Sequence, residues 1–146
     1  MSSLDTNDVL TRLLAIHYRS LAMYLSYAPP WHAHGQLEAG KVLGRIVANQ
    51  KRMVDRLGTM ILDNGGLVSY GSFPMLFTAY HDVSFDFLLT ILLERQHKEV
   101  NLLGKYADML RMSPMAHALA QEALGESKAH LDMLLDLPNP AVAQGA

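Results

Sequence analysis

The feature that most constrains the fold is a helical repeat of apolar residues in four long stretches. These stretches cover about Asn7–Ala28, Gln36–Asn64, Ser84–Arg111 and Ser113–Leu137. Apolar residues that recur three and four positions apart form one face of a helix. Paired prolines after the first stretch and paired glycines after the second are strong stop signals. The sequence therefore predicts an all-α fold, a four-helix bundle without strands.

The connections between the stretches limit how the helices can be arranged. The first and third connections are short, whereas residues Gly65–Val83 form a long one. A connection of this length can return along the whole bundle, so that the second and third helices run parallel. A second interpretation, that Phe73–Val83 contains a short helix of its own, stays open. We expect one domain over residues 1–137 and a disordered tail over residues 138–146.

Composition narrows the classes of function. The chain has 146 residues, a net charge of −2 and no cysteine. This charge gives no reason to expect binding to nucleic acid or to an anionic membrane surface, and no apolar run is long enough to span a bilayer. The lack of cysteine excludes disulfides, thiolate metal ligands and thiol catalysis. Because the N-terminus shows no signal peptide, we expect a cytoplasmic protein.

Motifs in the first two stretches resemble those of a known family. The segment LLAIHYRSLAMYL is similar to the first helix of bacterioferritins, with His17 at the position of a ligand glutamate and Tyr24 at the position of a tyrosine. The segment QKRMVDRLGTMILDNGG is similar to their second helix, with Gln50 and Met53 at the Glu-x-x-His ligand positions. Together with the long crossover, these motifs resemble the ferritin-like superfamily.

The fourth stretch carries a third motif of the same kind. The segment ESKAHLDML is similar to the last helix of bacterioferritins, whose Glu-x-x-His would fall on Ser127 and His130. Apart from His130, these ligand positions hold other residue types. The resemblance therefore implies a ferritin-like four-helix bundle with a degenerate dinuclear metal site.

Helical phase indicates which polar residues of the third stretch face the core. Glu94 and His97 spell Glu-x-x-His, but at 100° per residue they point away from the apolar side, so we expect them in solvent. Gln96 and Glu99 point inward. Glu99 is the better candidate for a carboxylate ligand from this helix.

The inward polar residues define two overlapping sets of candidates. The candidate metal ligands are His17, Glu99, Glu126 and His130, and the candidate buried polar or cavity-lining residues are Tyr24, Gln50, Met53 and Gln96. A dinuclear iron centre of this fold uses four carboxylates and two histidines, which this set does not supply. A mononuclear site for iron or zinc, made of both histidines and one carboxylate, stays open.

A structural role is the alternative for the same residues. Glu126 lies at the edge of the apolar stripe, where it could pair with an arginine of a neighbouring helix. Without a metal, His17, Gln50, Glu99 and His130 could hydrogen-bond to one another in a buried polar layer. Such bonding matters because a buried polar group without a partner costs about 1–3 kcal/mol.

Three functions from different classes stay open. We favour a bundle that has lost the dinuclear ferroxidase centre and acts through association, as a homodimer or with another protein. Apolar residues outside the core stripe, such as Leu25, Tyr27 and Leu62, favour a homodimer. The second is a metal-dependent oxidoreductase with a rearranged site around His17 and His130. The third is a binder of a small ligand or tetrapyrrole in an interhelical cavity.

Overall fold

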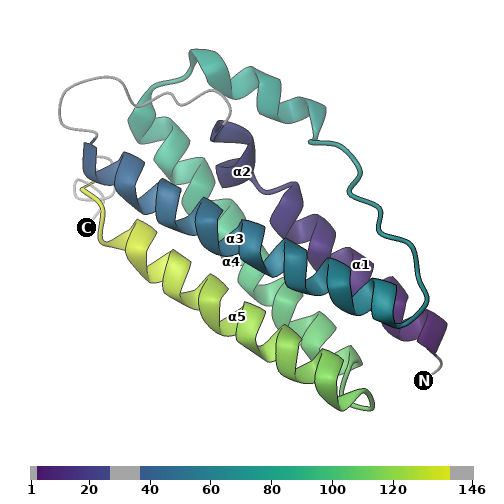
Figure 1. Ribbon diagram of the computed structural model, residues 1–146. Helices are drawn as coiled ribbons and strands as arrows, with labels where there is room; N and C mark the ends of the chain where they lie inside the picture. The colour runs from purple at the N-terminus through teal and green to yellow at the C-terminus, as the bar shows by residue number, and fades with distance from the viewer. Residues whose placement is uncertain (1–2, 27–36, 139–146) are drawn as a thin grey trace.

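Every regular element of the described chain is helical. The computed structural model describes residues 3–26 and 37–138. The elements are α1 (Ser3–Tyr18), α2 (Leu21–Leu25), α3 (Leu37–Asp63), the 3-10 helix η1 (Met75–Asp82), α4 (Phe85–Met109) and α5 (Pro114–Leu135) (Figure 1). The prediction of an all-α fold is confirmed for these residues, among which no strand occurs.

The four long helices α1, α3, α4 and α5 lie side by side (Figure 1). The most extensive packing joins α4 to α5 and α1 to α3, and contacts of α3 with α5 and of α1 with α4 complete the array. Helices α3 and α4 run in the same direction, because the chain between them returns along the outside of the molecule (Figure 1). This segment, residues 64–84, also contains η1, so the short helix that was left open as a second interpretation is present together with the crossover.

Local signals set most helix boundaries where the sequence predicted them. The Ser84 hydroxyl accepts a hydrogen bond from the Phe87 amide at 3.2 Å and caps α4. Gly65 has a φ of +83°, which favours glycine, and it directly follows the last turn of α3. Pro114 begins α5, but Ser113 does not cap this helix. Its hydroxyl lies 2.9 Å from the Thr6 hydroxyl of α1 instead.

The first helix differs from the prediction. A single helix was expected from Asn7 to Ala28, but α1 ends at Tyr18 and α2 begins at Leu21. Ser20 lies between them with an extended backbone, φ −66° and ψ 155°. Its hydroxyl accepts a hydrogen bond from the Met23 amide at 3.1 Å and donates one to Gln50 Oε1 at 2.7 Å. The serine therefore starts a new helix and also bonds to α3, which explains the break. Ala28 lies outside the described residues.

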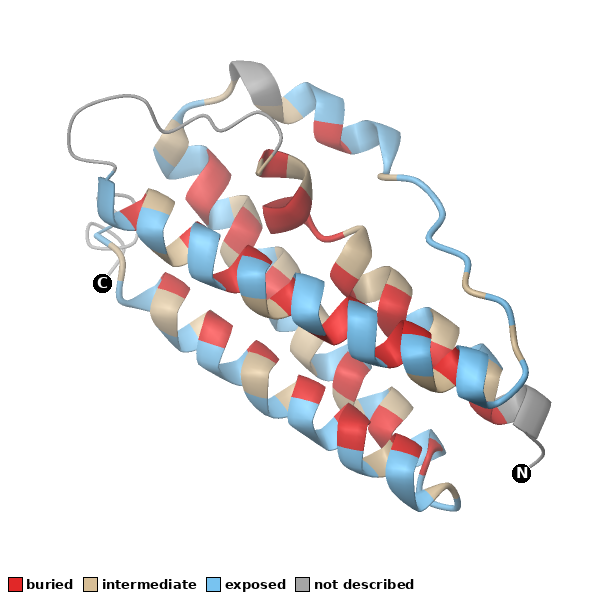
Figure 2. Cartoon of the chain, in the orientation of Figure 1, coloured by how far each residue is buried: buried red, intermediate tan, exposed pale blue. Residues whose placement is uncertain are grey.

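The core has two apolar parts. Near the N-terminal end of α1, Leu13 and Leu57 are among the residues that pack together from α1, α3, α4 and α5. Near the opposite end, Leu21 and Phe77 are among those that pack together from α2, α3, η1, α4 and α5. Figure 2 shows these buried residues on the inward sides of the helices. The polar residues described below occupy the level between the two parts.

Among the residues that the structure describes, no helix combines the length and apolar character that a bilayer crossing requires.

Candidate functional site

A buried polar layer separates the two apolar parts of the core. Six buried polar side chains from four helices and from the α1–α2 junction lie at this level: His17, Ser20, Gln50, Gln96, Ser127 and His130. Each of them is at most 5% exposed. The only other buried polar side chain in the described part of the chain is Thr6, and none of them is a carboxylate.

Hydrogen bonds join these residues in pairs across the helices. Gln96 Nε2 donates to the Ser127 hydroxyl at 2.8 Å and to the Ser127 carbonyl at 3.0 Å, which joins α4 to α5. Ser20 and Gln50 join the α1–α2 junction to α3, as described above. Both pairs use amide and hydroxyl groups, which stay neutral at all accessible pH values. The hydrogen bonds of these two pairs therefore involve no charged group.

The two histidines of the layer are held as neutral imidazoles. His17 Nδ1 donates to the Leu13 carbonyl at 2.8 Å, and burial lowers the pKa of His17 below its usual value. Burial, and to a smaller extent the nearby His17, lower the pKa of His130 to about 4. At neutral pH both rings are therefore uncharged, with His17 Nε2 left as an acceptor.

His130 connects the layer to the surface. The Asn49 side-chain amide lies 3.1 Å from His130 Nε2, and Arg52 donates to Asn49 Oδ1 at 3.2 Å. Because Asn49 Oδ1 accepts from the guanidinium, Asn49 Nδ2 is the donor to the imidazole. Arg52 also forms an ion pair of 3.1 Å with Glu126. The chain of contacts runs from exposed Arg52 to buried His130.

The candidate carboxylates occupy other places than the histidines. The Glu126 side chain is 20% exposed and bonded to Arg52, at the boundary of α5 and α3. Glu99 is partly buried on the side of α4 that faces α1, and it lines a small cavity with Ile16 and Arg19. Burial raises the pKa of Glu99 to about 8, and nearby Arg95 opposes this shift. Of the two inward residues of α4, Gln96 is the one that faces α5.

The remaining candidates, Met53 and Tyr24, lie in different apolar parts of the core. Met53 is fully buried in the first part, where it packs with neighbouring leucines. Tyr24 is half-buried beside the second part and contacts the rings of Phe73 and Phe77, with centroid distances of 5.3 and 5.5 Å. As expected, Glu94 and His97 are exposed.

The donor set does not fit an intact dinuclear metal centre of the kind that ferritin-like proteins hold. At the level where such a centre would lie, the buried groups are imidazoles, amides and hydroxyls. Within residues 3–26 and 37–138, no three side chains of histidine, aspartate or glutamate come together to hold a metal ion. Hard or borderline divalent ions prefer sites with anionic oxygen ligands beside imidazole. The layer as described is suited to hydrogen bonding.

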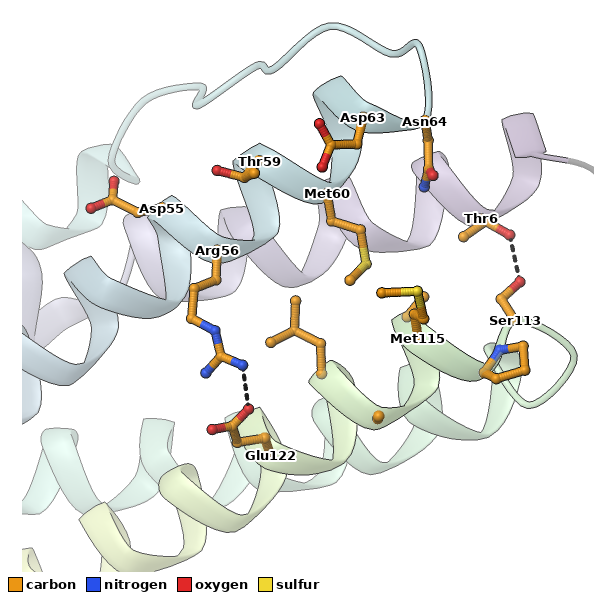
Figure 3. Close-up of a pocket in the computed structure, with 14 residues that line it drawn as sticks. Thr6, Asp55, Arg56, Thr59, Met60, Asp63, Asn64, Ser113, Met115 and Glu122 are labelled. Carbon is orange, nitrogen blue, oxygen red and sulfur yellow. Dashed lines mark hydrogen bonds and ion pairs between the residues drawn. The ribbon is translucent and has the colours of Figure 1, made fainter.

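A groove of about 940 Å³ lies away from this layer and opens between α3 and α5, near the start of α1 (Figure 3). Met60 and Met115 point toward each other across its middle, with the Arg56–Glu122 ion pair at one end and the Thr6–Ser113 contact at the other (Figure 3). The groove is an open surface feature, distinct from the interhelical cavity expected beside Met53 and Tyr24.

Two members of the polar arrangement were not anticipated from the sequence. Ser20 follows an arginine within an uninterrupted helical pattern, and only its place before an apolar run hints at a cap. Asn49 precedes Gln50 on the edge of the inward face, a position where asparagine is common on any helix.

No protein-family model matches this sequence, and no curated protein sequence matches it either.

Proposed function

We propose that this chain is a ferritin-like bundle in which a neutral polar layer has replaced the dinuclear metal centre, and that it acts through association and not as a ferroxidase. The observation that supports this most directly is chemical. His17, Gln50, Met53, Ser127 and His130 stand at the ligand positions named above, and all five are buried. None of the five is a carboxylate.

The partner of Ser127 suggests the missing position on α4. Gln96 faces Ser127 at 2.8 Å, whereas Glu99 lies toward α1. We therefore assign Gln96, and not Glu99, to the ligand position of this helix. With this assignment the carboxylates of the centre are replaced by an imidazole, two amides and a hydroxyl. Two iron ions could not be bridged or neutralised by this set.

Exposed apolar side chains support a role in association. Leu67, Met75, Met112 and Met115 are each at least 79% exposed, and Leu62 is 57% exposed. Large apolar residues on a surface are typical of contact regions when they occur together. Leu25, which we expected on the surface, is buried in the second part of the core because α2 turns it inward, and Tyr27 lies outside the described residues. The proposal of a homodimer therefore rests on the exposed residues of the long connection and of the α4–α5 corner.

Metal analysis tests the first half of the proposal. We expect protein purified without chelator to contain far less than one metal ion per chain, and to oxidise added Fe(II) no faster than buffer does. The matched control is H17Q/H130Q, which removes both imidazoles. Stoichiometric metal that disappears in this variant would overturn the proposal and would favour the metal-dependent oxidoreductase.

Sedimentation tests the second half. We expect a dimer or larger species in the micromolar range, and a shift to monomer in M115E or L67E, because a charge on an apolar contact opposes association. T90E, which changes an exposed polar residue of α4, is the control and should sediment as the wild type does. If the folded wild-type protein sediments as a monomer at every concentration, the result would count against a homodimer.

A further inference from the structure

A second, smaller cavity lies where the first helix breaks. It has a volume of about 330 Å³ and is lined by the end of α1, the middle of α4 and the long connection at Pro74. Its apolar wall includes Ile16 and Leu102, and its polar wall includes Arg19, Arg95, Lys98 and Glu99. The end of α1 at Tyr18 places Arg19 at the edge of this space.

The charges around this cavity do not cancel. Three cationic side chains face one carboxyl group, so the cavity is positive whichever protonation state Glu99 holds. Arg95 is the cation whose charge acts on Glu99, where it lowers the carboxyl pKa against the effect of burial. Its guanidinium also lies 4.5 Å from the centre of the Phe77 ring. Arg19 and Lys98 remain as cations that no carboxylate of the described chain pairs with.

Arg19 is held in place by one hydrogen bond, and other donors of its guanidinium make none within the described residues. Its Nε donates to the Tyr70 carbonyl at 2.9 Å, which ties the long connection to α1. Within residues 3–26 and 37–138, its terminal nitrogens make no hydrogen bond. A fixed guanidinium with free donors is a preorganised group for a planar anion, because little entropy is lost when it binds.

We propose that this cavity binds a small carboxylate anion, with its charged end at Arg19 and Lys98 and a short apolar end against Ile16 and Leu102. The two cations supply the charge-assisted hydrogen bonds that a carboxylate accepts. The apolar wall supplies burial for a chain of a few carbons. The volume is near the lower end of the range for small-molecule sites, which excludes large ligands.

Butyrate is the probe for this site, measured by calorimetry and by NMR at constant ionic strength. We expect saturable binding of butyrate and amide shifts confined to the end of α1 and the middle of α4. Butylammonium has the same chain with the opposite charge and should not bind. Inorganic phosphate lacks the apolar end and should bind more weakly than butyrate.

Variants of Lys98 test the assignment without disturbing the fold, since this side chain is exposed at the cavity edge. K98Q should weaken butyrate binding about tenfold, because one charge-assisted bond is lost, and K98E should weaken it further. K128Q removes an exposed lysine of α5 and is the matched control, with unchanged affinity.

Three results would overturn the proposal. The first is butyrate binding that does not saturate, and the second is equal affinity in wild type and K98E. The third is phosphate binding tighter than butyrate binding, which would reject a carboxylate ligand with an apolar end.

Discussion

Gln96 of α4 donates its side-chain amide to both the hydroxyl and the backbone carbonyl of Ser127 of α5, at 2.8 and 3.0 Å. Both residues are buried, at the level between the two apolar parts of the core. Helices α4 and α5 share the most extensive packing of the molecule. Apolar contacts alone tolerate small shifts of one helix along another, whereas this two-point bond fixes one register.

The first prediction follows from this pair. Q96L should lower the free energy of unfolding by about 2–3 kcal/mol, because it leaves the buried Ser127 hydroxyl without its donor. The double variant Q96L/S127A should be more stable than Q96L, since replacing both partners removes the unsatisfied group. Urea unfolding measures both effects, with Q121L on exposed α5 surface as control. A Q96L variant as stable as Q121L would contradict this role.

The second prediction separates the two functions of Ser20. S20A removes the cap of α2 and the buried bond to Gln50, whereas S84A removes only the exposed cap of α4. A lost cap costs about 1 kcal/mol, and an unsatisfied buried amide adds about 1–3 kcal/mol. S20A should therefore destabilise the protein clearly more than S84A in thermal unfolding. Equal losses would show that the bond to Gln50 contributes nothing.

The same residues show how far the sequence alone determines the fold. Helix starts and ends at Ser84, Pro114 and Gly65 were predictable, because caps, first-turn prolines and positive-φ glycines act within a few residues of themselves. The break at Ser20 was not predictable in this way. The partner of its hydroxyl, Gln50, is 30 positions away in the sequence. No local pattern contains that contact.

The candidate site was predictable as a set of buried polar residues but not as an arrangement. Helical phase placed both Gln96 and Glu99 inward, and both do face neighbouring helices. A central helix has two inward sides, however, one toward α5 and one toward α1. Phase within one helix does not distinguish between them, so only the packing of α4 assigns Gln96 to the layer and Glu99 to the small cavity.

The third prediction concerns stability at acidic pH. The pKa of His130 is lowered to about 4 in the folded chain, from 6.5 in the unfolded chain. The unfolded state therefore takes up protons first as the pH falls below 6.5, and stability is lost down to about pH 4. The loss from this residue should reach at most about 3 kcal/mol. In H130Q the slope of stability against pH should flatten in this range, whereas H97Q, which changes an exposed histidine, should keep the wild-type slope.

The fourth prediction concerns the opposite direction of pH. Burial raises the pKa of Glu99 to about 8, so the contribution of this group is full below about pH 4.5 and is lost as the pH rises through 8. E99Q has no such dependence. Its stability relative to wild type should therefore increase between pH 5 and pH 9, by about 2 kcal/mol after allowance for partial solvent exposure. E94Q, at an exposed position of the same helix, should show no such trend. Parallel stability curves for E99Q and wild type would reject the raised pKa.

The last prediction concerns how the long connection is held against α1. Gly71 has a φ of +72°, and a Cβ atom there would meet the Arg19 guanidinium that bonds to the Tyr70 carbonyl. Gly65 has a similar φ of +83° but open space around it. G65A should cost about 1–2 kcal/mol through backbone strain alone. G71A should cost more, because it also displaces Arg19 and frees the connection from α1. Hydrogen exchange of residues 68–80 should become faster in G71A but not in G65A. Equal exchange in the two variants would show that Arg19 does not fasten this segment.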